Sequence, residues 1–480
     1  MIEAATTRIR QFGGDRDLAP LTKVPREVPS SRKQARIGLL EHCGTGNLGD
    51  DATVAAVLQQ IRARWPDASV VGLSLDPSDS QHRHGIRAFP IRQSVFAFEK
   101  DWSWDRPFAV PTTTLAGRLK QLLRGNRVLF NIVKSLYITF VRKPVSLVRE
   151  VAFLGRSLAL AYHLDILIIC GGGQLLDWGG PWAFPYTIFK WVFLARCTGA
   201  KCFFLNNGAG PLDHRLSRWF ARRALSLGDY VSLRDRRSEA VVRGIGFRGN
   251  TQVVADCAWI LRVPDCLRGA VGGPQRDQIS VGIGPMAYCD PSRHWVKDVE
   301  RYRQLIDTLA DFGSRLVARG HRLSLFSSDI WFDSRAIADL EAAIRERISE
   351  AARQRVVREP VSSIDEFLSR LQRVDCYVTC RFHGVVLSHL LGVPALAIAP
   401  HPKVTTLMEE AGLSDYCIDI SQCRADSLML KFDRMVGNEK EIKVRTRRHV
   451  SSCQGALRRQ FDHLFPATAD SERCLGKRVR

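Results

Sequence analysis

The feature that most constrains this chain is a repeated alternation of short apolar runs with segments of helical periodicity. In the first example, an apolar run over residues 37–42 meets a glycine-rich turn and then a segment whose apolar residues recur at helical spacing. A second apolar run, SVVGLSL at 69–75, follows a Pro-Asp turn. Strand, helix and strand in this order form the βαβ unit of a parallel sheet.

The alternation continues along the chain and restarts after a break at 262–278, which is rich in Pro, Gly and charge. Each apolar run is short and ends in Gly or a polar residue, as expected for buried parallel strands whose carboxyl ends open on a cleft. The later runs are DILIIC, KCFFLNN, YVSL and TQVVAD before the break, and QISVGIGP, HRLSLF, QRVVREP, DCYVTC, VPALAIAP and YCIDI after it. The sequence therefore predicts an α/β protein with two Rossmann-like domains that face each other across a cleft.

The same pattern sets the expected domain boundaries. We expect a disordered leader over 1–35, an N-terminal domain over 36–261, a C-terminal domain over 279–430 and a helical, basic tail over 431–480. Residues 113–163 do not fit the alternation, because they combine nine Lys or Arg and one Glu with apolar residues at helical spacing. They predict either a helical insert with a solvated basic face or an interfacial helix that meets anionic lipid.

Charge and cysteine usage narrow the cellular setting. The net charge of +21 implies acidic partners, which include nucleic acid, anionic lipid and small polyanionic substrates. The 13 cysteines form neither a CxxC motif nor a disulfide or metal framework, so we expect a reduced cytoplasmic compartment and no metal site. The amino terminus lacks the apolar region of a signal peptide, and charges interrupt every apolar stretch. We therefore expect a soluble or peripheral protein.

Cations gather at the predicted strand ends. Arg381 and His383 follow DCYVTC, Lys403 follows the next strand, and Arg234 ends YVSLRDRRS. Arginine binds oxyanions in a bidentate manner and lysine binds them as a point charge, while histidine transfers protons near neutral pH. These side chains suit a phosphate-bearing substrate. The alternative interpretation of His383 is a core histidine bonded to a carbonyl group.

A glycine-rich turn, GTGNLGDD at 44–51, joins the first strand to its helix. Such a turn favours an anion at the helix amino terminus, although it matches neither the dinucleotide fingerprint nor a Walker A loop. Asn47 and Asp50 are polar groups that a sugar hydroxyl could use; alternatively, Asp50 is only the N-cap. Three glycines at 171–173 permit close approach of a ligand or of the opposite domain, or serve a turn that needs positive φ.

Taken in order, GTGNLGDD, GGG, NNGAGP, SLRDRRS, VVAD, CRFHG and PHPK resemble the motifs of the polysaccharide pyruvyltransferase family, over residues 36–420. The resemblance implies a two-domain fold like that of GT-B glycosyltransferases. It also implies transfer of pyruvate from phosphoenolpyruvate to a sugar of a polysaccharide or its precursor, which forms a cyclic ketal and needs no cofactor. By this resemblance, His383 is the catalytic residue, Arg381, Arg234 and Lys403 bind phosphoenolpyruvate, and the two polar residues of the glycine-rich turn face the acceptor.

Two other functions remain open at this stage. A GT-B glycosyltransferase that uses a nucleotide sugar would share the fold and the cationic cleft. A non-enzymatic basic protein at a membrane or on nucleic acid would explain the charge but not the converging Arg381, His383 and Lys403, and the chain has no recognisable nucleic-acid-binding module. We expect phosphoenolpyruvate and a sugar acceptor as partners, the latter lipid-linked, with peripheral contact through 113–163 at the inner face of the membrane and no nucleic acid.

Overall fold

The structure, a computed structural model, describes residues 34–41, 44, 46–93, 143–264, 278–292 and 296–466. These ranges leave out almost all of the expected leader and most of the expected linker. They also leave out the greater part of the basic insert, up to residue 142. Among the described residues, no helix has both the length and the apolar character needed to cross a bilayer.

The N-terminal half is built on a parallel sheet of seven strands, with the order β3-β2-β1-β4-β5-β6-β7. The strands are β1 (Arg36–Leu40), β2 (Ser69–Ser74), β3 (Arg87–Pro90), β4 (Ile166–Cys170), β5 (Lys201–Asn207), β6 (Tyr230–Leu233) and β7 (Gln252–Val253). Strand β4 is buried throughout and sends Ile166 and Ile168 to one face of the sheet and Leu167 and Ile169 to the other. Both faces are therefore covered, as parallel sheets require.

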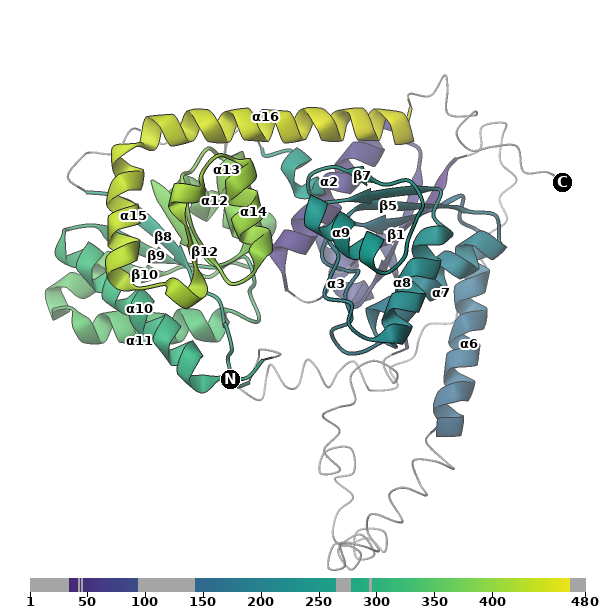
Figure 1. The fold of residues 1–480 in the computed structure, drawn as a ribbon, viewed down its shortest axis with the longest axis horizontal. Helices are drawn as coiled ribbons and strands as arrows, with labels where there is room; N and C mark the ends of the chain where they lie inside the picture. Colours follow the sequence, from purple (N-terminus) through teal and green to yellow (C-terminus); the bar gives the residue numbers. More distant parts are fainter. Residues whose placement is uncertain are drawn as a thin grey trace, which may run out of the picture.

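Helices α2 (Leu48–Arg64) and α3 (Pro77–His84) follow the first two strands. Helix α2 packs in the hydrophobic cluster that contains Ile166 and Ile168. The helices α6 (Lys143–Tyr162), α7 (Phe184–Cys197), α8 (Arg215–Ser226) and α9 (Arg236–Gly244) contribute to the cluster on the opposite face. Figure 1 shows α6, α7 and α8 together on one side of this domain.

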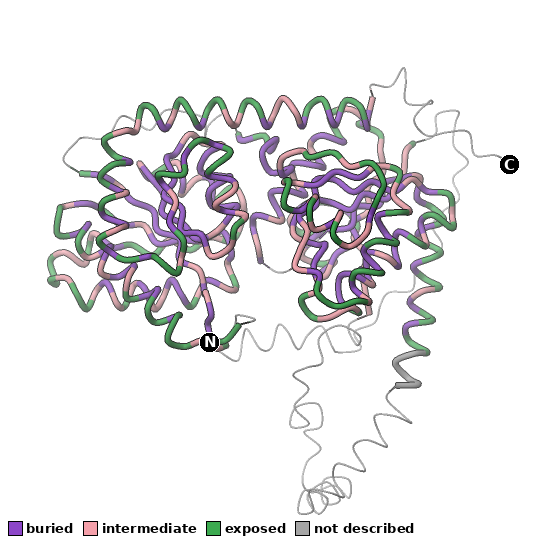
Figure 2. The backbone as a smooth tube through the Cα atoms, viewed as in Figure 1, coloured by how far each residue is buried: buried purple, intermediate pink, exposed green. Residues whose placement is uncertain are grey.

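The C-terminal half repeats the plan with six parallel strands in the order β10-β9-β8-β11-β12-β13. The strands are β8 (Ser280–Gly284), β9 (Arg322–Leu325), β10 (Val356–Arg358), β11 (Cys376–Thr379), β12 (Ala395–Ala399) and β13 (Cys417–Asp419). The helices are α10 (Val299–Ala318), α11 (Ser334–Arg347), α12 (Ile364–Gln372), α13 (Phe382–Leu390), α14 (Pro402–Glu410) and α15 (Ala425–Gly437). Figure 2 shows the strands of both sheets as the buried centre of each domain.

Helix α16 (Glu439–Leu464) runs along both domains, at the top of Figure 1. Its far end docks on the N-terminal domain, where Gln460 donates hydrogen bonds to Asn206 Oδ1 (2.8 Å) and Ser232 Oγ (2.9 Å), and Arg64 donates to Asp462 (2.6 Å). This helix begins in the C-terminal domain and ends on the other one. It therefore ties the two domains together.

A short backbone bridge also joins the domains. The amide of Leu48 donates to the carbonyl of Ser328 (2.8 Å), and the amide of Ile330 donates to the carbonyl of Gly46 (3.0 Å). The glycine-rich turn is thus paired with the segment that follows β9. The expectation of two Rossmann-like α/β domains is confirmed, because both sheets have the 3-2-1-4-5-6 strand order of that fold.

Candidate functional site

The predicted site residues lie at the interface between the domains, at the carboxyl ends of the strands. Helix α13 begins shortly after β11, α14 begins shortly after β12, and Arg234 follows the last residue of β6. The side chain of Arg381 does not cap the first turn of α13, and the amide groups at such a helix start favour an anion. Ligands of open α/β sheets bind at this edge.

His383 is the second residue of α13 and is buried between the domains. A Cβ atom on Gly49 of α2 would lie 2.0 Å from His383 Nδ1 and 2.2 Å from Cγ, so only glycine allows the imidazole to rest there. On the other side, Nε2 lies 3.8 Å from Asp256 Oδ2, which is ion-pair distance but longer than a hydrogen bond. The C-terminal domain therefore supplies the histidine, and the N-terminal domain supplies both surfaces that hold it.

Asp256 is the site residue that the sequence analysis did not single out. It caps the 3-10 helix Cys257–Ile260, and its Oδ1 accepts hydrogen bonds from the amide of Ala258 (3.0 Å) and from Thr53 Oγ1 (3.1 Å). Its Oδ2 is buried without a hydrogen bond and faces His383 and Arg234. Burial alone would raise the pKa of Asp256, but interaction with His383, and then the charge of Arg234, hold that pKa well below its usual range. Asp256 is thus a carboxylate aimed at the histidine.

The signal for Asp256 was present in the sequence. It ends the apolar VVAD run, just before the buried residues of the 3-10 helix. An acid at the end of a buried strand belongs to the same pattern as Arg234, and this pattern could have indicated a site role for Asp256.

Arg234 and Lys403 both lie close to the Phe382 ring. The Cζ of Arg234 is 4.9 Å from the ring centroid, and the Nζ of Lys403 is 5.9 Å from it. A Cβ atom on Gly208 would lie 2.4 Å from Nη2 of Arg234, so the backbone closely confines the guanidinium. Arg234 also donates to Asp235 (3.2 Å) and lies 3.7 Å from Asp256 Oδ2. The structure brings two predicted cations close to the histidine.

Burial and the cations of the site lower the pKa values of Lys403 and His401. Burial, followed by repulsion from Arg234, lowers the pKa of Lys403 to about 8, while Asp50 opposes this change. Burial and repulsion from Lys403 lower the pKa of His401 to about 4, so this imidazole is neutral at pH 7. His401 caps α14, where its Nδ1 accepts from the amide of Lys403 (3.4 Å). A dianionic ligand would relieve the repulsion between these cations.

Arg381 is placed differently from the other cations. Its Nε and Nη2 donate to both carboxylate oxygens of Asp333 at 2.8 and 2.6 Å, and Nη2 lies 3.1 Å from Asp329. Burial would lower the pKa of Arg381, but these two carboxylates raise it instead. Asp333 in turn accepts from the amide of Ala287 and from Ser327 Oγ. The charge of Arg381 is therefore neutralised within the protein, and the side chain braces the loops beside α13.

Asn47 and Asp50 lie at the start of α2. Asn47 caps the helix, because its Oδ1 accepts from the amide of Gly49 (3.0 Å), and its backbone forms the bridge to Asp329. The alternative that Asp50 is the N-cap is therefore wrong. Asp50 belongs to the first helical turn, with Oδ1 near Gly172, which has a φ of +67°. The glycine-rich turn and the triple glycine thus meet at the same edge of the sheet.

The two Rossmann-type sheets, the polar site between them and the returning α16 define a two-domain α/β protein of the GT-B type. The fold is similar to that of S. aureus MnaA in a complex with UDP, with a TM-score of 0.53 and 8% identity over 93% of this chain and 99% of that one. It is also similar to the UDP-GlcNAc 2-epimerase from Methanocaldococcus jannaschii, with a TM-score of 0.47 and 8% identity over 84% and 92%.

The sequence comparisons identify the family. A family model described as polysaccharide pyruvyl transferase matches residues 47–402, so the chain belongs to this family and is a transferase. The chain is also 20% identical over 433 residues to the amylovoran biosynthesis protein AmsJ of Erwinia amylovora, covering 84% of this chain and 93% of that protein. The expected family membership is confirmed.

Proposed function

We propose that this transferase moves the pyruvyl group of phosphoenolpyruvate to a sugar of a polysaccharide or its lipid-linked precursor, forming a ketal and releasing phosphate. The observation that carries the proposal is the position of His383, held between Gly49 and Asp256 with Arg234 and Lys403 nearby. A proton-transfer group next to clustered cations suits a substrate that must be protonated at carbon while it loses phosphate.

The donor is assigned to the start of α13 and α14 in the C-terminal domain, with Arg234 reaching it from the N-terminal domain. Arg234 and Lys403 bind the carboxylate and phosphate of phosphoenolpyruvate, together with the uncapped amide groups at the start of α13. Arg381 supports this pocket without binding the donor directly, because Asp329 and Asp333 already bind its guanidinium. The acceptor is assigned to the N-terminal side, where Asn47 and Asp50 begin α2.

The chemistry balances with one histidine and two sugar hydroxyls. A proton added to the methylene carbon of phosphoenolpyruvate makes a methyl group and leaves C2 electrophilic; the first hydroxyl attacks C2 and loses its proton. The C2–O bond to phosphate then breaks, the second hydroxyl attacks C2, and its proton is released. One proton ends on the methyl group, and the other leaves with phosphate.

His383 carries the proton in this scheme. The negative charge of Asp256, 3.8 Å from Nε2, favours a proton on that atom, and Nδ1, on the Gly49 side, is then the nitrogen that exchanges protons with the reactants. The cations stabilise the departing phosphate, and the buried interface strengthens these interactions by excluding water.

The test is incubation of the protein with phosphoenolpyruvate and candidate nitrophenyl or lipid-linked sugars. We expect phosphate release together with a sugar mass increase equal to pyruvic acid minus water. His383→Ala should abolish turnover while calorimetry still detects phosphoenolpyruvate binding, because Arg234 and Lys403 remain. Near-normal turnover of His383→Ala would exclude this role.

A glycosyltransferase acting on a nucleotide sugar is the competing function, because it would share the fold. A thermal-shift comparison separates the two: phosphoenolpyruvate should raise the melting temperature, and UDP and GDP should not. Stabilisation by a nucleoside diphosphate, without stabilisation by phosphoenolpyruvate, would favour the glycosyltransferase. We further propose action at the cytoplasmic face of the membrane, where a lipid-linked acceptor would be presented and where the basic residues of 113–163 would meet anionic lipid.

A further inference from the structure

An aromatic cluster lies on the face of the N-terminal domain formed by α7 and α8. Phe189 of α7 stacks on Phe193 (centroids 5.8 Å apart) and contacts Trp219 of α8 (5.4 Å) and Phe220 (5.3 Å). Trp182 and Tyr186 extend the same set of ring contacts through Phe220. Six aromatic side chains therefore form one continuous group on this face.

The outer side of this cluster is open to solvent. Phe193 is 48% exposed and Trp219 is 41% exposed, although both rings contact Phe189. Large apolar side chains that are exposed next to one another mark an interaction surface rather than scattered surface residues. Trp and Phe at the edge of a polar surface are typical of the interface between water and lipid.

Arginines surround the aromatic cluster. Helix α8 carries Arg215, Arg218, Arg222 and Arg223, all exposed, and has no acidic residue along its length. The guanidinium carbon of Arg223 lies 5.9 Å from the Trp219 ring centroid, so the charged and aromatic parts of the surface adjoin. A surface of this charge complements an anionic partner.

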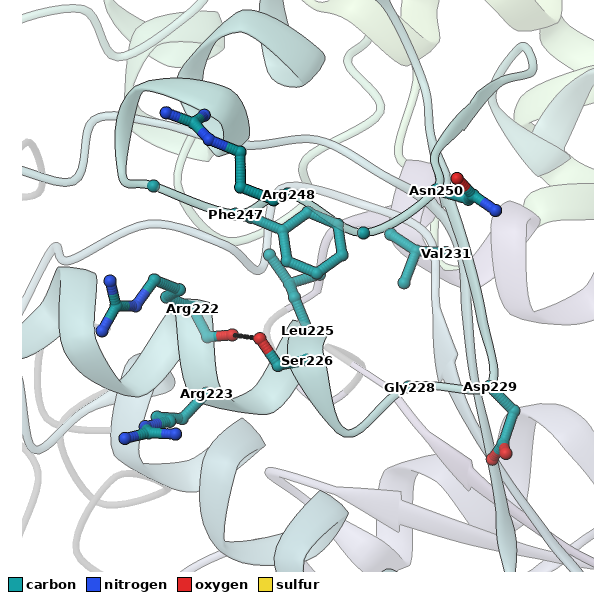
Figure 3. A pocket seen from close by; sticks show the side chains of 12 residues that line it. Arg222, Arg223, Leu225, Ser226, Gly228, Asp229, Val231, Phe247, Arg248 and Asn250 are labelled. Atoms are coloured by element: carbon teal, nitrogen blue, oxygen red, sulfur yellow. Dashed lines mark hydrogen bonds between the residues drawn. The ribbon is translucent and has the colours of Figure 1, made fainter.

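A cavity of about 510 Å³ continues this surface at the carboxyl end of α8 (Figure 3). Arg222, Arg223 and Arg248 lie at its edge, and Phe247 forms part of its wall. The single acid that lines it, Asp229, is already bound by Arg196 (2.8 Å) and by the amide of Cys202 (2.8 Å). The cavity is therefore positive and large enough for a phosphate head group.

The cavity is separate from the catalytic site. It lies beside the residues that precede β6, whereas Arg234 follows the last residue of the same strand. A ligand in the cavity would therefore leave the catalytic edge of the sheet open. Helix α6 packs on α7 through Glu150 and Lys190, and it carries the exposed apolar residues Val151 and Leu158.

We propose that the α7–α8 surface, defined by Phe193, Trp219 and the arginines of α8, seats the enzyme on a bilayer that contains anionic lipid. Phe193 and Trp219 enter the head-group region, and Arg215, Arg222 and Arg223 bind lipid phosphates. This proposal rests on the proposed function in one respect: the reason for membrane binding would be access to a lipid-linked acceptor. Membrane binding itself does not depend on catalysis.

The test is co-sedimentation of the full chain with vesicles of phosphatidylcholine alone or mixed with phosphatidylglycerol, at low and high salt. We expect binding to the mixed vesicles that weakens with salt. R215Q/R222Q/R223Q and F193S/W219S should each reduce binding at least tenfold. The controls R447Q/R448Q/R458Q on α16 and L430S/V444S change exposed residues elsewhere, and Leu430 and Val444 are more exposed than Phe193 and Trp219; these variants should bind within twofold of the wild type.

Wild-type-like binding of both surface variants would overturn the proposal and assign membrane contact to the basic segment 113–142. Equal binding to both lipid compositions, or none to either, would also overturn it. So would a change in the oligomeric mass of F193S/W219S by light scattering, because the surface would then join copies of the chain. Phosphate release with a water-soluble acceptor should persist in all four variants, so failure of the membrane proposal is distinguishable from failure of the proposed function.

Discussion

Replacing Gly49 with alanine is the most specific test of the site, because it displaces the His383 side chain while leaving that residue unmutated. The added Cβ would lie 2.0 Å from His383 Nδ1, 2.2 Å from Cγ and 2.4 Å from its Cβ. Carbon atoms in contact sit about 3.5 to 4.0 Å apart, so the ring or the start of α2 must move by roughly 1.5 Å. The ring cannot swing away alone, because its own Cβ is also too close.

This displacement sets the expected magnitudes. A misplacement of about 1 Å in a catalytic group costs on the order of 100-fold in rate, so we expect kcat of Gly49→Ala to fall by at least about that factor. Overpacking costs about 1–3 kcal/mol, partly offset by the gain of roughly 1 kcal/mol when alanine replaces glycine in a helix. The variant should therefore fold, with a modestly lower melting temperature and nearly unchanged phosphoenolpyruvate binding.

Gly437→Ala is the matched control, because Gly437 ends α15 and an added Cβ there meets nothing within 4 Å. Steady-state kinetics, a melting curve and calorimetry with phosphoenolpyruvate should be recorded for both variants. If Gly49→Ala turned over within about threefold of the wild type while remaining folded, the contact between α2 and His383 would not fix the catalytic geometry.

Three further predictions follow from the charges. Asp256→Asn should lower kcat about 100-fold without raising the KM for phosphoenolpyruvate, and a rise in KM alone would show that Asp256 serves only binding. Because the pKa of Lys403 is lowered to about 8, it loses its charge as pH rises, so KM should increase between pH 7 and 9 and stay flat in Lys403→Arg. Burial raises the pKa of Glu41 from 4.5 to about 7, so the folded protein holds a proton that the unfolded chain releases. Stability should fall as pH rises through this window, by on the order of 3 kcal/mol, and Glu41→Gln should abolish the decline in urea unfolding at pH 5 and 8.

The fold was largely predictable because its strands are short apolar runs that end in glycine or polar residues. β3 was missed because Arg87–Pro90 is a short, partly exposed edge strand with a proline and no clear apolar pattern. The TQVVAD run gave only a two-residue strand, since Ala255 and Asp256 already lead into the 3-10 helix. A helical tail was expected over 431–480, and the structure has α16 up to Leu464, with residues beyond 466 outside the described ranges. The contacts of α16 with Asn206 and Ser232 connect residues more than 200 positions apart, which no local pattern records.

The site was predictable only in part, for a related reason. Strand ends in parallel sheets share one edge, so Arg234, His383 and Lys403 could be placed together from their positions in the alternation. The partners of Arg381 could not, because Asp333 lies 48 residues away in a segment that carries no motif. Sequence patterns locate charged residues near a site, but only the packing shows which charges are already neutralised.

The proposed role of His383 makes catalysis depend on how the two domains are held together. His383 belongs to the C-terminal domain, whereas the surfaces on both sides of its ring, Gly49 and Asp256, belong to the N-terminal domain. Opening the interface would therefore separate the histidine from its carboxylate and would move Arg234 away from Phe382 at the same time. The bridge between the glycine-rich turn and the segment after β9 lies next to these contacts, and α16 spans the same interface from outside. Under the proposed mechanism, proton transfer by His383 therefore requires the closed arrangement of the domains, because only that arrangement keeps the imidazole beside Asp256.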